Sequence, residues 1–231
     1  MSENGTPTSW NWTFTGGTPS TSTLQNPTVN YATPGLFPVK LVVSNLAGAD
    51  SITKNSFINI NSSTAQYSGA YTESFESSSI PNNDWFIQNN DEYSWEQSTP
   101  GFTGQYSMHL NNINAADGVV DIAVTPSINI ASIPSPVLTF KLAYAVKSLS
   151  DSDRLRIFTS TNCGRTWTQR YSKKGPPLAS APQQPFNVFI PTLAQWKTET
   201  VNINNVSSVS NVKFKFEFTG GAGNDIYIDD I

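Results

Sequence analysis

Apolar and polar residues alternate along many short segments of this chain, which is the pattern of β-strands with one buried face. The clearest segment covers residues 212–218, where one Val and three Phe residues alternate with two Lys and one Glu. Another covers residues 226–231 and carries two adjacent carboxylates near its end. Because no helical period separates such segments, the pattern predicts an all-β protein with almost no helix.

The alternating segments fall into two groups, which predict two domains. The first domain covers residues 1–62, a polar linker covers 63–70, and the second domain covers 71–231. Strands of the first domain are predicted at residues 10–14, 35–43 and 50–60. Strands of the second are predicted at residues 72–75, 85–88, 95–97, 107–110, 119–125, 137–146, 155–160, 167–171, 197–203, 212–218 and 226–231. So many strands without a helical insert predict that the second domain is a jelly-roll β-sandwich.

Composition supports this fold class and excludes several partners. Only 13% of the residues are charged, and Ser, Thr, Asn, Gly, Pro and aromatic residues are frequent, which suits short strands joined by turns. The net charge of -4 leaves nothing to neutralise phosphates, so we expect no nucleic-acid partner. No segment approaches the ~18 apolar residues of a membrane span, so we expect no membrane insertion. We expect the protein to be a monomer. Because the start lacks a signal sequence, we also expect this chain to be part of a longer protein.

The chain has one cysteine and one histidine, which limits its catalytic chemistry. A single cysteine excludes an internal disulfide, and we interpret Cys163 as part of a turn between two strands, at residues 162–164. A zinc peptidase needs two histidines one helical turn apart, so His109 alone excludes that activity, and we expect it at the surface or supporting a turn. Nothing around Cys163 or His109 marks an activated nucleophile. The sequence therefore predicts that this chain is not an enzyme.

A hydrolase of glycosidic bonds is the alternative enzyme class, because it needs only two carboxylates flanking a cleft. The acidic residues available for such a pair are Asp91, Glu92, Glu96, Asp117 and Asp121. In an acidic protein such residues are usually solvated turn residues, so a non-catalytic chain is the leading hypothesis.

The first domain carries an ordered series of motifs. They are Trp12-x-Phe14, Asn26-Pro27, Tyr31-x-x-Pro34-Gly35 and Val39-x-Leu41-x-Val43-x-Asn45-x-x-Gly48-x-Asp50. Their spacing and order resemble the PKD domain, which implies an Ig-like β-sandwich. The Trp-Asp-Phe-Gly-Asp-Gly motif of that family reads Trp-Thr-Phe-Thr-Gly-Gly here, and the strands that precede it are missing. We therefore expect exposed apolar surface and open backbone edges in this domain.

The second domain carries a different series. It consists of Phe75-Glu76, Pro81-x-x-x-Trp85, Trp95, Gly104-x-x-Ser107-Met108-x-Leu110 and residues 227–231. This series resembles the jelly-roll modules of the MAM and carbohydrate-binding superfamily and the cleaved-adhesin domains of bacterial surface proteases.

More narrowly, three segments are similar to modules of secreted Bacteroidetes proteins: residues 160–167, Lys174-Gly175 and residues 195–201. Such a module follows a PKD domain and precedes a type IX secretion sorting domain, and some of these proteins carry a pappalysin-like (cytophagalysin) zinc metallopeptidase domain upstream. The resemblance implies accessory modules that are secreted or lie at the cell surface.

Calcium is the cofactor that the resemblance implies. In the modules that this domain resembles, the Phe-Glu and Asp-Asp positions contribute to a calcium site, which here selects Glu76, Asp229 and Asp230. Asn111 and its neighbour Asn112 could add amide or carbonyl oxygens, which are ligands that Ca²⁺ prefers. Strand alternation lets only one of the two aspartates point inward, and the pattern does not decide which. A turn rich in Asp and Asn without metal is the alternative.

Aromatic side chains are predicted mainly in the core, and four are candidates for ligand binding. The predicted core residues are Tyr71, Phe75, Trp85, Tyr106, Leu110, Phe140, Leu142, Phe158, Trp167 and Trp196. The candidates for stacking on sugar rings are Trp85, Trp95, Phe102 and Tyr106. The leading hypothesis is a pair of accessory β modules that space the parent protein and bind an extracellular protein or polysaccharide. A true carbohydrate-binding module is the alternative.

Overall fold

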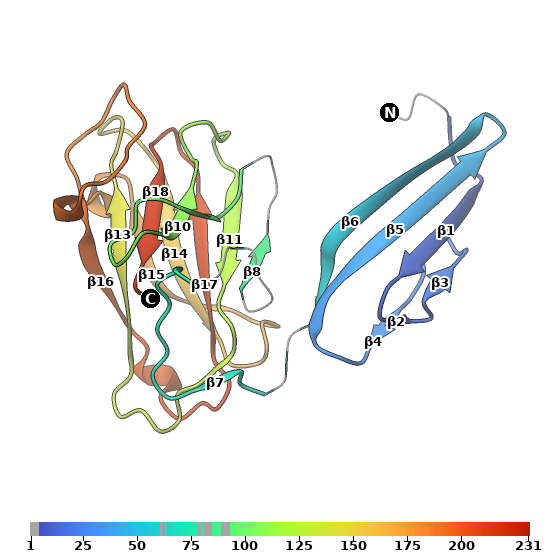
Figure 1. Cartoon of the computed structure of the whole chain (residues 1–231), viewed down its shortest axis with the longest axis horizontal. Coiled ribbons are helices and arrows are strands. Elements are labelled where there is room, and N and C mark those ends of the chain that lie inside the picture. Colours follow the sequence, from blue (N-terminus) through green and yellow to red (C-terminus); the bar gives the residue numbers. More distant parts are fainter. Residues whose placement is uncertain (1–4, 61, 63, 78–79, 81–84, 89–92) are drawn as a thin grey trace. The chain divides into compact units, whose positions relative to one another are not determined.

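The computed structural model describes residues 5–60, 62, 64–77, 80, 85–88 and 93–231 (Figure 1). The chain forms two compact units, Met1–Ser62 and Ser63–Ile231. Both are built from strands, with three short 3-10 turns in the second unit as the helical elements of the described residues. The predicted all-β fold class is confirmed.

The first unit is built on a four-stranded antiparallel sheet in the order β3-β1-β5-β6. Its strands are β1 (Ser9–Phe14), β3 (Thr21–Ser22), β5 (Gly35–Asn45) and β6 (Gly48–Ile60), and β2 (Gly17–Thr18) pairs separately with β4 (Asn30–Tyr31). Phe14 and Val39 are its buried apolar side chains, and four large apolar side chains are exposed: Leu24, Leu46, Ile52 and Phe57. The expected exposure of apolar surface is therefore present in this unit.

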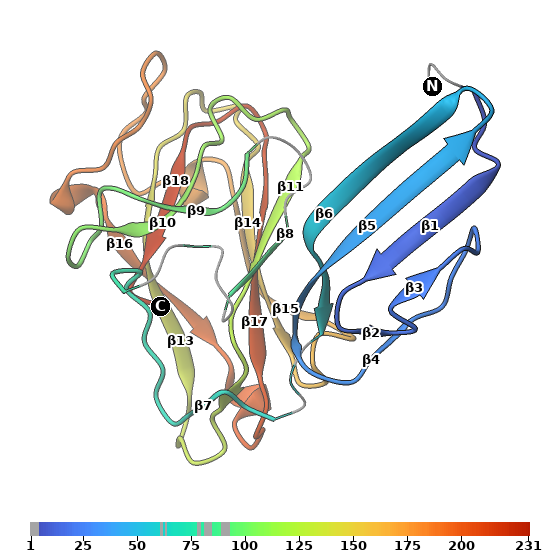
Figure 2. The same ribbon diagram turned by 45° about the vertical axis from the view of Figure 1, so that its right-hand side comes forward.

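The second unit is a sandwich of two five-stranded antiparallel sheets. One sheet has the order β16-β13-β18-β10-β9, and the other has the order β15-β14-β17-β11-β8 (Figures 1 and 2). The strands of the first sheet are β9 (Glu96–Ser98), β10 (Ser107–Leu110), β13 (Val137–Tyr144), β16 (Lys197–Asn202) and β18 (Ile226–Asp229). Those of the second are β8 (Phe86–Gln88), β11 (Val120–Val124), β14 (Arg154–Ser160), β15 (Thr168–Lys174) and β17 (Lys213–Thr219). A short parallel pair, β7 (Tyr67–Ser68) with β12 (Ile128–Asn129), lies outside them.

The first and last segments of the second unit meet, although no strand forms at residues 72–75. The amide of Glu73 donates to the carbonyl of Ile231 at 2.8 Å, and the amide of Ile231 donates back to the carbonyl of Glu73 at 3.0 Å. This pairing brings the segment that contains Glu76 beside the end of β18.

The core lies between the two sheets and follows the predicted alternation. Phe214, Phe216 and Phe218 on β17 are buried in it, whereas Lys215 lies on the outer side of the sheet. Five predicted core residues are only half-buried: Tyr71, which packs against the core, and Tyr106, Phe158, Trp167 and Trp196. Phe158 follows a register shift on β14, and its ring lies under the ammonium group of Lys215 at 4.1 Å from the ring centre, outside the core.

The segment around Cys163 is a turn between β14 and β15, as predicted. Cys163 has a φ of 60°, and the Ser160 hydroxyl accepts the Gly164 amide at 2.9 Å. The Asn162 side chain accepts the Thr166 amide at 2.9 Å. These short-range bonds explain why the local sequence alone identified the turn.

Candidate functional site

Three predicted carboxylates converge on one loop, residues 99–106, which joins β9 to β10. Asp229 accepts the amides of Phe102 and Thr103 at 2.7 and 3.1 Å, through Oδ2. Asp230 Oδ2 accepts the hydroxyl of Thr103 at 2.8 Å. Glu76 Oε1 accepts the amides of Gln105 and Tyr106 at 2.9 and 2.6 Å. We call this segment the carboxylate-bound loop.

Both aspartates reach this loop because β18 ends between them. Asp229 is the last residue of the strand, and Asp230 has a φ of 47°. This left-handed conformation interrupts the strand, and both aspartates therefore bond to the loop, which alternation alone did not predict. Asp229 is fully buried and Asp230 half-buried.

Gly104 makes the approach of Glu76 possible. Its φ is 73°, and a Cβ at this position would lie 2.4 Å from the Glu76 carboxyl carbon. A residue with a side chain would therefore have to displace Glu76 from the loop amides.

Burial decides the charge state of Asp229. Loss of solvent raises the pKa of its carboxyl group to about 6, against the amides of Asp230, Thr103 and Phe102, which lower it. The nearby Asp230 carboxylate adds to the increase. Asp229 therefore changes charge in mildly acidic solution rather than near its ordinary value of 3.8.

The oxygens predicted to bind calcium serve here as acceptors of loop hydrogen bonds. In the part of the chain that the structure describes, no group of three or more His, Cys, Asp or Glu residues is placed to hold a metal ion. The side-chain oxygen of Asn111 accepts from Asn114 at 3.0 Å, and Asn112 is bound to Asp153 and to the Asn224 carbonyl. Neither asparagine has a hydrogen bond to the carboxylates at the loop.

Two of the four predicted sugar-stacking residues are excluded by burial. Trp85 is 1% exposed and Trp95 is fully buried, because both rings pack between the sheets. Trp95 meets the edge of Phe218 with a centroid distance of 6.3 Å. Phe102 and Tyr106 are half-buried on the carboxylate-bound loop.

Phe102 belongs to a group of rings on the outer side of the sheet that contains β18. We call this group the outer aromatic cluster; its members are Phe102, His109, Phe189, Trp196 and Tyr227. Centroid distances are 6.1 Å for Phe102–Trp196, 6.3 Å for Trp196–Tyr227, 4.5 Å for His109–Tyr227 and 6.3 Å for Phe189–Tyr227. The ammonium group of Lys141 lies 4.2 Å from the centre of the Phe102 ring, an attractive cation–π arrangement.

His109 is buried, so of its two predicted places, at the surface or supporting a turn, the surface is wrong. It is 7% exposed and lies between two carboxylates, Glu96 at 3.3 Å from Nδ1 and Asp225 at 3.1 Å from Nε2. Glu96 begins β9 and Asp225 directly precedes β18, and both of these strands pair with β10. Burial, together with Asp225 and Glu96, raises the pKa of the adjacent Tyr227 above its ordinary value.

Asn224 fixes the long connection between β15 and β16, a role for which no sequence motif was recognised. Its buried side chain accepts the amide of Phe189 at 2.8 Å and donates to the carbonyls of Asn187 and Gln184 at 2.9 and 3.3 Å. Phe189 is thereby held in the outer aromatic cluster. Residues 184–193 form what we call the anchored loop, and four of its apolar side chains are exposed: Phe186, Val188, Ile190 and Leu193.

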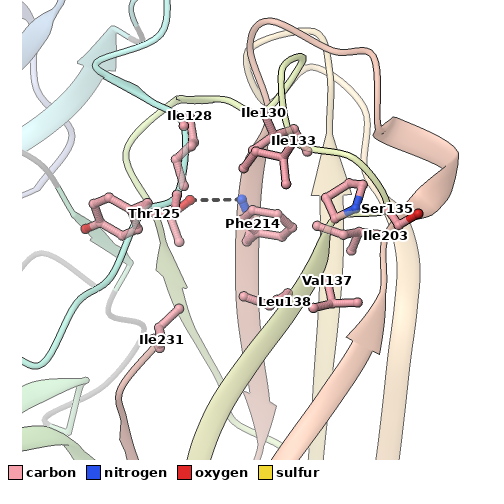
Figure 3. A pocket seen from close by; sticks show the side chains of 14 residues that line it. Thr125, Ile128, Ile130, Ile133, Ser135, Val137, Leu138, Ile203, Phe214 and Ile231 are labelled. Carbon is pink, nitrogen blue, oxygen red and sulfur yellow. Dashed lines mark hydrogen bonds between the residues drawn. The ribbon is translucent and has the colours of Figure 1, made fainter.

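An apolar cavity of about 230 Å³ opens elsewhere in the second unit (Figure 3). Its walls include Ile128, Ile130, Leu138 and Phe214. The Thr125 hydroxyl in the wall accepts the Phe214 amide at 2.9 Å and donates to the Pro126 carbonyl, so its hydrogen-bonding capacity is used. No Asp, Glu, Lys, Arg or His side chain is among the described residues of this wall.

Comparisons with known proteins agree with the two units. Residues 1–60 match the family model of the PKD domain, which confirms that resemblance. No curated protein matches the chain in sequence. None of the described helices is long and apolar enough to cross a membrane.

Among solved structures, the chain is similar to two cleaved adhesin domains of Lys-gingipain from Porphyromonas gingivalis. The K3 domain has a TM-score of 0.51 and 16% identity, over 69% of this chain and 95% of that domain. The K1 domain has a TM-score of 0.50 and 17% identity, over 69% and 94%. A carbohydrate-binding module of the β-sandwich superfamily matches with a TM-score of 0.42 and 18% identity, over 99% of this chain and 86% of that module. At these identities the likeness shows a shared β-sandwich fold.

Proposed function

We propose that this chain is a pair of non-catalytic β modules of a secreted bacterial protein, in which the second unit attaches to an extracellular protein or polysaccharide. The anchored loop is the observation that carries this proposal. Phe186 is 92% exposed, Ile190 66% and Val188 48%. Exposed apolar patches of this kind mark interaction sites in folded proteins.

The way the loop is held supports binding rather than accidental exposure. Phe189 is 2% exposed, whereas its neighbours Val188 and Ile190 face solvent. Asn224 holds the backbone at Phe189, through its amide, and at Asn187, through its carbonyl. A preformed apolar surface loses little conformational entropy when a partner binds, so more of the contact energy appears as affinity.

The chemistry of the buried polar groups supports a non-catalytic role. The imidazole of His109 bonds to two carboxylates, Glu96 and Asp225, rather than to a hydroxyl or thiol that it could activate. Asp225 Oδ1 in turn accepts the amide of Ile113 at 2.9 Å, so this group ties loops together.

Carbohydrate binding is the second candidate, and the edge of the outer aromatic cluster favours it. Phe102 and Trp196 are half-buried there, and Lys141 and Thr198 supply a polar border through their mutual hydrogen bond of 2.9 Å. Aromatic rings beside polar groups are what a site needs to stack on a sugar and bind its hydroxyl groups.

The wider setting of the modules is also a proposal. The order of a PKD domain followed by a cleaved-adhesin-like sandwich, together with the motifs at 160–167 and 195–201, supports a protein of the Bacteroidetes type that is exported by type IX secretion. A pappalysin-like metallopeptidase domain in the same protein would make these units its substrate-binding or surface-binding modules. The MAM-like relationship belongs to the same proposal.

A structural calcium ion at Glu76, Asp229 and Asp230 stays a prediction, and it would have to replace the amide donors of the carboxylate-bound loop. Thermal unfolding with excess calcium and with chelator tests it. A higher midpoint in calcium supports the site, because a metal that binds only the native state stabilises it. An unchanged midpoint refutes it.

Binding of the whole chain to immobilised gelatin, as a model extracellular protein, and to xylan, as a neutral polysaccharide, tests the proposed function. We expect the double variant Phe186→Ser/Ile190→Ser to bind gelatin at least about tenfold more weakly. Val137→Ser is the matched control, because Val137 is 59% exposed but lies at the start of β13, outside the anchored loop.

Each result has one meaning. Loss of gelatin binding in the Phe186/Ile190 variant but not in the Val137 variant supports the leading proposal. Xylan binding that disappears in Phe102→Ala/Trp196→Ala, without gelatin binding, supports the carbohydrate-binding alternative. Failure of the unaltered chain to bind either probe refutes both, as does equal weakening by the control.

A further inference from the structure

A positively charged hollow lies on the sheet opposite to the outer aromatic cluster. Arg154 and Arg156 project from the outer side of β14, next to Lys174 on β15, and these strands run side by side with β17 (Figure 2). The hollow has a volume of about 290 Å³, and its remaining lining is Asp117, Gly118, Ser152, Thr219, Gly220 and Gly221. In a chain with net charge -4, this concentration of cations is unexpected.

The cations of this hollow are placed at an electrostatic cost. Arg154 lies directly opposite Lys174 in the antiparallel pairing of β14 with β15. Like charges in directly opposed positions destabilise a sheet. Among the described residues, no carboxylate lies within 4.0 Å of the charged nitrogens of Arg154 or Lys174. The ion pairs on the outer face of this sheet instead join Arg156 and Lys215 to Glu217. An anion between Arg154 and Lys174 would remove the repulsion.

Two polar atoms at the hollow lack partners. The Nε atom of Arg156 and the hydroxyl oxygen of Thr219 are buried and form no hydrogen bond with any described residue. Arg156 uses another nitrogen to bind Glu217 at 2.5 Å. Buried polar atoms without partners are rare in folded proteins and destabilise the fold, so a bound group that satisfied them would be stabilised.

The floor of the hollow is rigid backbone. Ser152 donates its amide to the Gly221 carbonyl at 2.9 Å, and Gly221 donates its own to Asp153 at 2.8 Å. A Cβ on Gly221 would lie 2.4 Å from the Ser152 hydroxyl oxygen, so the two segments are in close contact. The opening is therefore preformed, and its volume is near the lower end of small-molecule sites, roughly 300 Å³.

The surroundings favour a sugar acid over an acidic peptide. Serine and threonine hydroxyls and glycine backbone line the hollow beside the cations, which suits a ring that carries both hydroxyls and a carboxylate. Farther along the same face, the half-buried rings of Phe158 and Trp167 lie 4.1 and 5.4 Å from the ammonium group of Lys215. Cations interleaved with aromatic rings match a polymer of negatively charged sugars.

We propose that this hollow binds the carboxylate of a uronic-acid residue in an acidic polysaccharide, with Arg154 and Lys174 as its charge partners. Arg156 and Thr219 supply further donors. Asp117 is exposed at the rim of the hollow, and its negative charge repels more highly anionic groups from that side. The proposal stands on a different sheet from the anchored loop and does not depend on it.

Calorimetric titration of the whole chain with trigalacturonate tests the proposal. We expect binding that weakens as salt is added, because the contact is between charges. Arg154→Gln/Lys174→Gln should bind at least roughly tenfold more weakly, the loss expected for charge-assisted hydrogen bonds. The matched control is Lys40→Gln/Arg165→Gln, which removes the same charge from exposed positions outside the hollow. It should bind within about twofold of the unaltered chain.

Two further arms identify the ligand, and a third tests the repulsion between Arg154 and Lys174. The methyl-esterified trimer, which lacks free carboxylates, should not bind, and a tetraglutamate peptide should bind at least about tenfold more weakly than trigalacturonate. Thermal unfolding should show that Lys174→Gln is at least as stable as the unaltered chain, since it removes a like-charge pair. No binding of trigalacturonate, equal binding of its ester or of tetraglutamate, or equal loss in the control overturns the proposal. So does a lowered midpoint of Lys174→Gln.

Discussion

Replacing Asn224 by alanine should release the anchored loop from the sandwich. The Asn224 side chain is fully buried and accepts two backbone amides, Phe189 at 2.8 Å and Asp225 at 2.9 Å. Both residues are 2% exposed, so alanine leaves two buried donors without an acceptor. Each such donor costs about 1–3 kcal/mol. We expect the free energy of unfolding to fall by about 2–4 kcal/mol. The least stable small domains unfold at a cost of about 5 kcal/mol, so this loss would remove most of the stability of such a domain.

Urea unfolding measures this loss, and hydrogen exchange locates it. The amide of Phe189 should lose its protection, while amides of β17 should keep theirs relative to global stability. Asn187→Ala is the control, because its side chain is exposed and only its backbone carbonyl bonds to Asn224. A loss of stability that is no greater in Asn224→Ala than in Asn187→Ala would refute the anchoring role.

Three further predictions concern the carboxylate-bound loop. The first compares the free energy of unfolding of the unaltered chain with that of Asp229→Asn. The difference between them should fall by up to about 3 kcal/mol as the pH rises from 4 to 7, because a pKa of about 6 in the folded state favours the protonated acid. That contribution is complete below the unfolded value of 3.8 and is lost as the pH rises through 6; a flat difference would contradict it. Gly104→Ala should lower the urea midpoint by an amount equivalent to about 1–3 kcal/mol, since its Cβ would displace Glu76, and an unchanged midpoint would show that the loop adapts. If the predicted calcium ion binds at this loop, calcium should raise the thermal unfolding midpoint of Asp229→Asn and of Gly104→Ala less than that of the unaltered chain.

Local alternation was enough to predict much of the sandwich but not the side of every ring. Phe214, Phe216 and Phe218 alternate with charged residues, so their burial followed from the pattern. On β14 strict alternation puts Phe158 on the same outer face as Arg154 and Arg156, so its prediction as a core residue followed its apolar ring rather than the period of the strand. Trp95 is buried by the opposite sheet, which no local pattern reveals.

The candidate site was predicted only as far as family resemblance reached. Resemblance brought Glu76 together with Asp229 and Asp230, and the structure places all three at one loop. Asp230 has a left-handed backbone conformation just after β18, which strand periodicity could not supply. The contact of His109 with Asp225 requires β10 to lie beside β18, and this strand order joins residues 116 positions apart.

Hydrogen exchange with and without bound ligand tests the central claim most directly. The whole chain is compared free and saturated with whichever of gelatin or xylan it binds. The attachment proposal predicts slower exchange in residues 184–193 of the second unit, and the carbohydrate alternative predicts it around Phe102 and Trp196. Protection confined to other segments, or no change on saturation, would contradict the claim that this side of the sandwich is the attachment surface.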